Sequence, residues 1–483
     1  MKIERPFVHL LRSPNGWYFF DVNRNEIVAT SAEVYRALEG LLKGAGEEDL
    51  PAEVVEELHN IRAMGYLSNK RVKTIRHSAT DSLEQYLRNN MSTITLQLTQ
   101  NCNFRCSYCV YSELSNTGQR AHSAKCMSWE TAKAALDFLL AHSRDSEEVS
   151  VGFYGGEPLL EMELLKQSVL YAEEMFEGKT LFFNMTTNGS LLTEEITRFL
   201  VEHNIKVMVS IDGPKEIHDI NRRFAANGKG SFDVVRRNLE RIAREYPAFF
   251  REMSVSMVVD PQNDYDRIRS LYDDGSVFRE VTVHSSVIDD VYSLEKTVYS
   301  HDYISKRDYE IFLAYLAHFG RLDPAACSPM AREEVGSMLS RLQNMTGSAE
   351  LPDETSHGGP CIPGKNRLLV TVDGAFYPCE RVSESSPALR LGDLKHGFDY
   401  EQARRVLNIA ALTADRCREC WALSLCNQCA KHADNGGELS GDFKQSFCDG
   451  TLKNARRELE YILMLKEIPA IYQKEEKAER SVG

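Results

Sequence analysis

The sequence predicts an α/β protein whose central part is an open, partial (β/α)6 TIM-like barrel. Between residues 91 and 290, strand-like runs alternate with amphipathic helix patterns. This alternation predicts a parallel sheet with right-handed crossovers, and six units fall short of the eight that close a barrel. Functional groups are then expected at the carboxyl ends of the strands. The predicted strands are 93–99, 148–154, 180–187, 206–212, 252–259 and 279–288.

The regions on either side of the barrel have different patterns. Three strand-like runs (7–11, 17–22 and 26–30) precede two helix patterns, with Ser31 as N-cap and Pro51 as first helical residue, which predicts a small winged-helix-like domain. Within the barrel, Ser128 is expected to cap a helix over 129–142. The predicted domains are 1–76 (winged-helix-like), 90–290 (barrel), 291–355 (helical bridge), 356–450 (Cys-rich) and 451–483 (a helix from about Thr451 to Lys466, then a frayed tail from Gln473).

Composition narrows the functional class. The chain has 483 residues, a net charge of −14 and no basic run, so we expect no nucleic-acid partner. It has neither an apolar stretch of membrane-spanning length nor a signal-like N-terminus, which predicts a cytoplasmic protein without a membrane partner. Twelve cysteines in such a chain favour metal or cluster binding over disulfides.

Three cysteines directly follow the first predicted strand. Cys102, Cys106 and Cys109 have the spacing CxxxCxxC, and we call them the first set. Structural zinc sites close with four protein ligands, and fully ligated 4Fe–4S clusters are held by four cysteines. Three thiolates therefore leave one coordination position open, where a small molecule can bind. An incomplete zinc site is the alternative.

Polar and glycine-rich segments follow the next three predicted strands. The second strand leads into Gly155-Gly156-Glu157-Pro158, where the glycines permit close backbone approach and the proline fixes the turn. The third leads into Asn188, and the fourth carries Ser210 and Asp212. Arginines downstream suit a bidentate grip on a carboxylate, and Arg222 is favoured over Arg223.

Seven more cysteines lie between residues 361 and 448. A strand-like run over 367–373 and an Asp-Gly turn predict a β-hairpin that holds two of their thiolates. CxxC pairs also suit zinc, so a pair of zinc knuckles is the alternative. Cys126 is expected to be a buried free thiol. The seven are Cys361, Cys379, Cys417, Cys420, Cys426, Cys429 and Cys448.

The CxxxCxxC spacing and the GGEP turn one unit later resemble the radical SAM superfamily. The resemblance implies that the first set holds a 4Fe–4S cluster whose open iron binds S-adenosylmethionine (SAM). It implies further SAM contacts: the amino group at the GGEP turn (Gly155, Gly156, Glu157, Pro158), the ribose and carboxylate edges at Asn188, Ser210 and Asp212, the methionyl carboxylate at Arg222, and adenine against Tyr108.

The second group of cysteines resembles the SPASM domain, which binds two auxiliary 4Fe–4S clusters. The resemblance implies that the distal cluster is held by a first group of four cysteines, which we call the distal set: Cys417, Cys420, Cys426 and Cys448. Cys361, Cys379 and Cys429 hold the proximal one (the proximal set). This family usually has three residues before the last cysteine of its third block, whereas Cys426 and Cys429 are separated by two. The proximal set is one thiolate short, so either Cys327 completes it or a substrate thiolate binds there, and we favour the open site.

Residues 1–76 resemble the RiPP recognition element, which binds leader peptides by adding a strand to its sheet. A structural N-terminal cap is the alternative. Together these features resemble sactipeptide and ranthipeptide synthases, which form thioether crosslinks. The resemblance implies three 4Fe–4S clusters, SAM, a precursor peptide with a leader, and a flavodoxin- or ferredoxin-type electron donor. Competing hypotheses are a sulfatase-maturase-like enzyme that forms formylglycine and a zinc-stabilised peptide-binding scaffold. No catalytic base is assigned.

Overall fold

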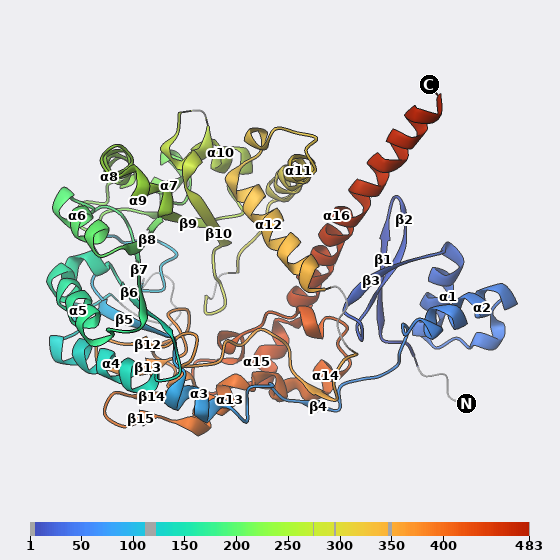
Figure 1. The fold of residues 1–483 in the computed structure, drawn as a ribbon, viewed down its shortest axis with the longest axis horizontal. Helices are drawn as coiled ribbons and strands as arrows, with labels where there is room; N and C mark the ends of the chain where they lie inside the picture. The colour runs from blue at the N-terminus through green and yellow to red at the C-terminus, as the bar shows by residue number, and fades with distance from the viewer. Residues whose placement is uncertain (1–4, 112–121, 274, 294–295, 346–349, 483) are drawn as a thin grey trace.

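The barrel occupies one side of the molecule, with its helices on the outer face of a curved sheet (Figure 1). The computed structural model describes residues 5–111, 122–273, 275–293, 296–345 and 350–482, with side chains up to 469. Six parallel strands lie in the order β10-β9-β8-β7-β6-β5. They are β5 (Thr93–Thr99), β6 (Glu148–Gly155), β7 (Thr180–Thr187), β8 (Ile205–Ser210), β9 (Ser254–Val259) and β10 (Thr282–Val287). The helices between them are α4 (Trp129–His142), α5 (Met162–Met175), α6 (Glu194–Glu202), α7 (Lys215–Asn221), α8 (Phe232–Glu245), α9 (Pro247–Glu252) and α10 (Tyr265–Arg269).

The alternation of strand and helix patterns in the sequence predicted the bounds of these strands closely. The predicted bounds of β5 and β7 match the structure, and Ser128 caps α4 by accepting a hydrogen bond from the Thr131 amide. The last strand begins three residues later than expected because 277–280 form a short 3-10 helix, opened by Ser276. The apolar residues there fill a helical turn before the strand starts.

The sheet does not end at β5. A two-residue strand from the Cys-rich region, β12, pairs with β5 in parallel, placing Leu369 opposite Thr95. Antiparallel strands continue from it, so one ten-stranded sheet runs in the order β10-β9-β8-β7-β6-β5-β12-β13-β14-β15. The predicted hairpin is present, shorter than expected, with its turn at Gly374 (φ +80°). These strands are β12 (Leu369–Val370), β13 (Ala375–Tyr377), β14 (Gly392–Asp393) and β15 (Gly397–Phe398).

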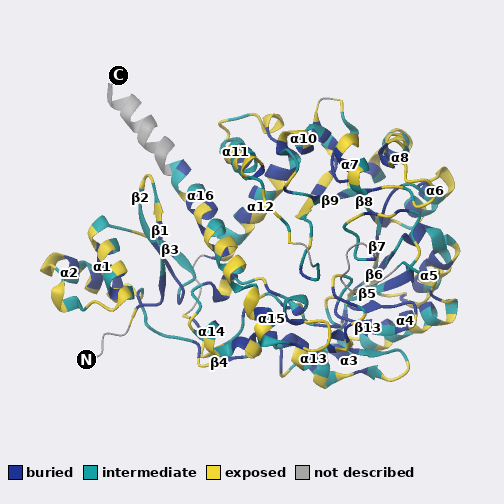
Figure 2. Cartoon of the chain, turned by 180° about the vertical axis from the view of Figure 1, so that it is seen from behind, coloured by how far each residue is buried: buried dark blue, intermediate teal, exposed yellow. Residues whose placement is uncertain are grey.

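The N-terminal unit is an antiparallel sheet, β1-β2-β3, followed by two helices. Because side chains alternate across a strand, neighbouring residues of β2 belong to different cores. Phe19 packs with α1 and α2, whereas Phe20 packs with the Cys-rich region and α16. Each face of this sheet therefore packs on a core, and in Figure 2 its strands carry buried residues among intermediate and exposed ones. The elements are β1 (Val8–Ser13), β2 (Gly16–Asp21), β3 (Glu26–Thr30), α1 (Ala32–Lys43) and α2 (Ala52–Ala63).

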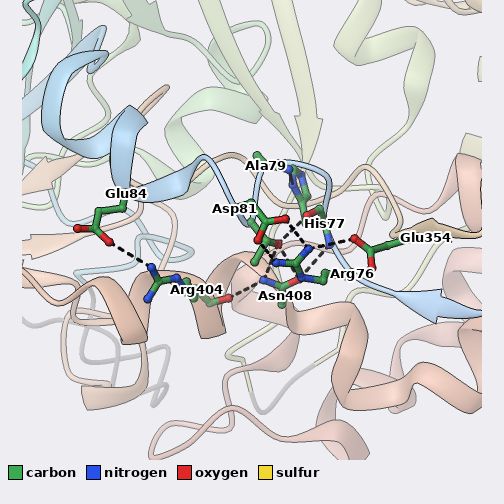
Figure 3. Close-up of polar contacts among 9 residues, drawn as sticks. Arg76, His77, Ala79, Asp81, Glu84, Glu354, Arg404 and Asn408 are labelled. Carbon is green, nitrogen blue, oxygen red and sulfur yellow. Dashed lines mark hydrogen bonds and ion pairs between the residues drawn. The ribbon is translucent and has the colours of Figure 1, made fainter.

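The connector after this unit is attached to the Cys-rich region (Figure 3). Its strand β4 (Thr74–Ile75) pairs with β11 (Glu354–Thr355). Arg76 donates to Asp81 and to Glu354, and the His77 amide donates to Asn408 at 2.9 Å. The helix α3 (Leu83–Asn89) then leads into β5. Exposed ion pairs of this kind contribute little each, so the strand pairing and the Asn408 bond fix the path.

Helices complete the fold. The bridge contains α11 (His301–His318) and α12 (Pro329–Asn344), and the Cys-rich region adds α13 (Tyr400–Leu407), α14 (Ala414–Arg418) and α15 (Gly441–Ser446). The last helix, α16 (Cys448–Val482), is much longer than expected, since it continues past Pro469 and includes the residues for which we expected a frayed tail. No helix in the described part of the chain has the length and apolar content needed to cross a membrane.

The two faces of β2 give matched test variants. Phe19→Ala and Phe20→Ala each remove a fully buried ring, and each should lower the free energy of unfolding by about 3–5 kcal/mol. Hydrogen exchange should separate them. Phe19→Ala should speed amide exchange in α1 and α2, and Phe20→Ala should speed it in α16. The same exchange map for both variants would show that the two cores are not distinct.

Candidate functional site

The first cysteine set lies in the loop that follows β5. The three thiols are close enough for Cys102 and Cys109 both to raise the pKa of Cys106 by their charge. Main-chain N–H groups point at two of the sulfurs: Phe104 donates to Cys102 at 3.3 Å and Tyr111 donates to Cys109 at 3.5 Å. Burial raises the pKa of Cys102 and of Cys106 to about 12. Amide donors to sulfur are typical of cysteines that ligate iron–sulfur clusters, so this donor set fits a cluster.

The GGEP turn packs directly on this loop. The Gly156 amide donates to the Thr99 carbonyl at 2.9 Å, and the Glu157 amide donates to the Asn101 carbonyl at 3.0 Å. A Cβ on Gly155, whose φ is +139°, would lie 2.2 Å from the Thr99 oxygen, and one on Gly156 would lie 2.1 Å from the Asn101 oxygen. Contacts this short with backbone cannot be relieved by a rotamer change. The two glycines are therefore required for the turn to support the cysteine loop.

The Glu157 side chain connects two segments of this arrangement through hydrogen bonds. Its carboxylate has no exposed surface and accepts hydrogen bonds from the Leu159 amide, the Thr187 hydroxyl at 2.7 Å and the Asn188 amide at 2.8 Å. Burial raises its pKa to about 7, against these donors. We expected the carboxylate to accept hydrogen bonds from an ammonium group, but in this structure both of its oxygens accept hydrogen bonds from the protein itself. It ties the turn after β6 to the end of β7, and Pro158, also buried, opens the short helix that follows.

The polar residues after β7 and β8 gather near the first set. Asn188 donates to Asn103 at 2.8 Å and lies 3.9 Å from the Cys102 sulfur. Ser210, at the end of β8, is buried. These side chains lie at the strand ends, where the sequence predicted them, and their contacts with SAM stay a prediction.

Asp212, Arg222 and Tyr108 form one cluster. The Tyr108 hydroxyl donates to Asp212 Oδ2 at 2.5 Å, and Arg222 Nε lies 2.9 Å from the same oxygen, although its N–H is poorly aimed for a hydrogen bond. The guanidinium also lies 5.5 Å from the centre of the Tyr108 ring. Arg223 is exposed, so the structure favours Arg222 of the two arginines. Burial raises the pKa of Tyr108 well above its usual value, so the hydroxyl keeps its proton.

The distal set surrounds a cavity. Cys417, Cys420, Cys426 and Cys448 line a small cavity of about 30 Å³ at the junction of α14, α15 and α16. Burial raises the pKa of Cys420 to about 11, and the other three thiols of the set raise it further. Four sulfurs that face one cavity fit the binding of a metal or a cluster.

The proximal set is a separate group of three. Besides burial, the charge of Cys361 raises the pKa of Cys429, and the charge of Cys429 raises that of Cys379, so the three thiols lie near one another. Burial raises the pKa of Cys379 to about 12, whereas Cys361 is exposed. Arg367 and Glu380, ion-paired at 3.0 Å, lie beside Cys379. This set therefore opens to solvent.

Neither remaining cysteine joins a set. Cys327 is buried among α11, α12 and α16, and its thiol donates to the Pro324 carbonyl at 3.3 Å. None of its described contacts is with the proximal set, which does not support it as a fourth ligand. The prediction of a buried Cys126 is wrong: this thiol is exposed and lies 2.9 Å from a Glu161 oxygen. A local bridge to Thr99 holds it at the surface.

In the described residues, no group of three or more His, Cys, Asp or Glu side chains is close enough to hold a single metal ion. A four-iron cluster is larger than one ion and needs its thiolates further apart.

Sequence reasoning missed the buried polar residues around the distal set. Lys444, His357 and Gln428 line the same cavity, and each is about 1% exposed. For Lys444, the signal in the sequence was its position four residues before Cys448. His357 and Gln428 carry no pattern of their own, because only the folded chain brings them to the cavity. Gln97, buried on β5, is a further omission, and it donates to Tyr111 and to Glu384.

Glu157 gives the fold a pH dependence with a defined sign. Its pKa is about 7 in the folded chain and 4.5 ordinarily, so folding favours the protonated form. The stability that it contributes is full below about pH 4.5 and is lost as the pH rises through about 7. Between these limits, wild type should lose roughly 3 kcal/mol relative to Glu157→Gln in urea unfolding. Glu148→Gln, on the exposed start of β6, should follow wild type, and parallel wild-type and Glu157→Gln curves would contradict the assignment.

The glycine contacts make a second prediction. Gly155→Ala and Gly156→Ala should displace the cysteine loop and cost the reconstituted protein the iron of one cluster, about four atoms per chain. Gly178→Ala is the control, because its φ is +91° and no atom lies within 4 Å of its Cβ position. The Gly178→Ala protein should have the backbone strain without a steric clash, and it should keep its iron. Full iron in the Gly156→Ala protein would show that the loop tolerates the shift.

Comparisons with known proteins agree with this geometry. Residues 96–274 match the model of the radical SAM superfamily. A cysteine-type anaerobic sulfatase-maturating enzyme of Clostridium perfringens is 24% identical over 70% of this chain and 87% of its own length. An uncharacterized protein of Methanocaldococcus jannaschii is 36% identical, over 29% of this chain and 45% of its own length. A radical SAM cyclopropyl synthase of Paramaledivibacter caminithermalis is 26% identical over 31% of this chain and 32% of its own length.

A solved structure shows the same fold. The sulfatase-maturating enzyme anSMEcpe with bound AdoMet aligns with a TM-score of 0.57 at 20% identity, covering 78% of this chain and all of that one. The matched region starts within β5 and includes the first cysteine set, the GGEP turn and the Asp212 cluster. Such a domain implies a 4Fe–4S cluster and SAM, which the residues present fit. Residues 96–274 are therefore similar to a radical SAM domain.

Proposed function

We propose that this protein is a radical SAM enzyme that installs thioether crosslinks in a ribosomally made precursor peptide. Its first set would hold the SAM-binding cluster, and the proximal and distal sets would hold two auxiliary clusters. The N-terminal unit would bind the leader, and a flavodoxin- or ferredoxin-type protein would supply electrons. The observation that carries the proposal is the proximal set: in the part of the chain that the structure describes, no fourth thiol joins these three, and Cys361 is exposed.

The chain's own residues have separate roles under this proposal. Bound together, the cluster and SAM supply the 5′-deoxyadenosyl radical that removes a hydrogen atom from carbon. The Gly155–Gly156 turn holds the cysteine loop in place, and Glu157 fixes that turn. Arg222 supplies a buried positive charge for a carboxylate, and Asp212 orients it. The proximal set offers an open position to a peptide cysteine.

Similar proteins support a peptide substrate. One solved anSMEcpe structure, at 19% identity and TM-score 0.57, contains AdoMet and a peptide named Cp18Cys. That relative also supports a second candidate, oxidation of one cysteine or serine to formylglycine, because its sequence match spans most of both chains. About a fifth of this chain has no counterpart in the aligned anSMEcpe chain, which leaves room for an added peptide-binding unit.

A turnover experiment separates the candidates. Reduced, reconstituted enzyme with SAM and a Cys-rich precursor should yield 5′-deoxyadenosine and a peptide lighter by two hydrogen atoms per crosslink. Cys361→Ala/Cys379→Ala should still form deoxyadenosine but no crosslink, and Cys126→Ala, outside all three sets, should behave as wild type. A product whose aldehyde reacts with a hydrazide would favour formylglycine and sink the thioether proposal.

Leader binding is tested by a separate experiment. Deleting the N-terminal unit would expose Phe20 and its neighbours, which pack on α16, so a truncated enzyme is a poor test. The full chain should instead be given the same peptide with and without its leader. We expect crosslinking of the leaderless peptide to fall at least tenfold and free leader to inhibit. Equal turnover of both peptides would reduce the N-terminal unit to a structural cap.

A further inference from the structure

The cavity of the distal set contains a buried positive charge. Lys444, on α15, is 1% exposed. Its ammonium donates to the Thr413 hydroxyl at 3.0 Å and lies 4.0 Å from the Cys417 sulfur. Among the described residues it forms no ion pair with a carboxylate. An ammonium group removed from water without an opposite charge costs several kcal/mol, so this lysine needs an anion at the cavity.

The hydrogen bonds of Lys444 lead to sulfur. Because the Thr413 hydroxyl accepts from Lys444, its own proton is free to point elsewhere. The Cys417 sulfur lies 3.3 Å away, whereas the Ala410 carbonyl lies 3.5 Å away. Lys444 and Thr413 therefore form a donor chain that ends on a thiol of the distal set. A positive charge delivered in this way stabilises a negatively charged group held by those sulfurs.

Two further donors belong to the same cavity. The Nδ1 atom of His357 accepts from the Gly359 amide at 3.3 Å, so in a neutral ring the proton is on Nε2. That Nε2 atom is buried and has no hydrogen-bond partner among the described residues, and His357 lines the cavity. Gln428 donates to Thr451 at 3.0 Å and lies 3.8 Å from the Cys448 sulfur. The cavity thus presents a charge and several N–H or O–H groups to whatever the thiols bind.

We propose that Lys444 is the counter-charge of the distal cluster and that, with His357 and Gln428, it raises the reduction potential of that cluster. The inference rests on the proposed cluster assignment and goes beyond it. Cluster potentials depend on net charge and on hydrogen bonds to sulfur. One-electron reduction, by the external donor protein, adds one negative charge to the cluster, and a nearby ammonium favours that state.

The test is a redox titration followed by electron paramagnetic resonance. The first cluster is removed by Cys102→Ala/Cys106→Ala/Cys109→Ala, so that only auxiliary signals remain. Lys444→Met should lower the ratio of reduced to oxidised distal cluster roughly tenfold at a fixed potential, a shift of about 59 mV to the negative side. The proximal signal is an internal reference and should not move. Lys453→Met, an exposed lysine on α16, is the matched control and should change neither signal.

Two more variants keep the test decisive. Lys444→Arg retains the charge and should restore the wild-type potential, and Gln428→Leu should give a smaller shift of the same sign. If Lys444→Met binds no distal cluster while Lys444→Arg does, iron analysis alone supports the counter-charge. An intact distal cluster with an unchanged potential in Lys444→Met overturns the inference, as does loss of iron in both lysine variants with no shift in Gln428→Leu. Zinc in place of iron at the wild-type distal set would instead refute the proposed function.

Discussion

The contact between the GGEP turn and the backbone of Thr99–Asn101 is the constraint on which the rest of the site depends. Two main-chain hydrogen bonds join these segments at a separation that only glycine allows. Glu157 then extends the connection to the end of β7 through two accepted hydrogen bonds, from Thr187 and Asn188. The ends of three adjacent strands are thereby fixed to one another. A cysteine loop held by backbone on its inner side can present its sulfurs without support from long side chains.

The second constraint is the continuity of the sheet through β5. One edge of β5 pairs with β6, and the other pairs with β12 from the Cys-rich region. Gln97 reinforces this join, because its side chain accepts from the Val372 amide and donates to Glu384. The strand that ends in the first cysteine set is therefore bonded directly to the hairpin that precedes Cys379. The first set and Cys379 of the proximal set therefore follow strands of the same sheet.

Much of this arrangement was predictable, and the failures have physical causes. Strands β5 and β7 were located to the residue because they are regular apolar or alternating runs between clear helix patterns. The first set was predicted from its spacing, whereas the distal and proximal sets came from the resemblance to the SPASM domain. The structure places the four thiols of the distal set around one cavity. The pairing of β12 with β5 was not predicted, because a strand of two residues carries no periodic signal and its partner is over 270 residues away. The burial of Lys444 was missed because composition favours an exposed lysine, and the cavity that holds it is a tertiary feature.

The covering of the N-terminal sheet limits how it can meet a partner. Its α1 and α2 helices cover one face, and α16 with the region around the distal set covers the other. His9 of β1 stacks on Trp421, next to Cys420, with ring centres 3.7 Å apart. A peptide cannot reach either face without displacing a core. The edges of β1 and β3 are the parts of the sheet that remain for contact with a partner. An edge strand binds a partner through its free backbone groups. A peptide that added a strand to this sheet would therefore have to pair with β1 or β3.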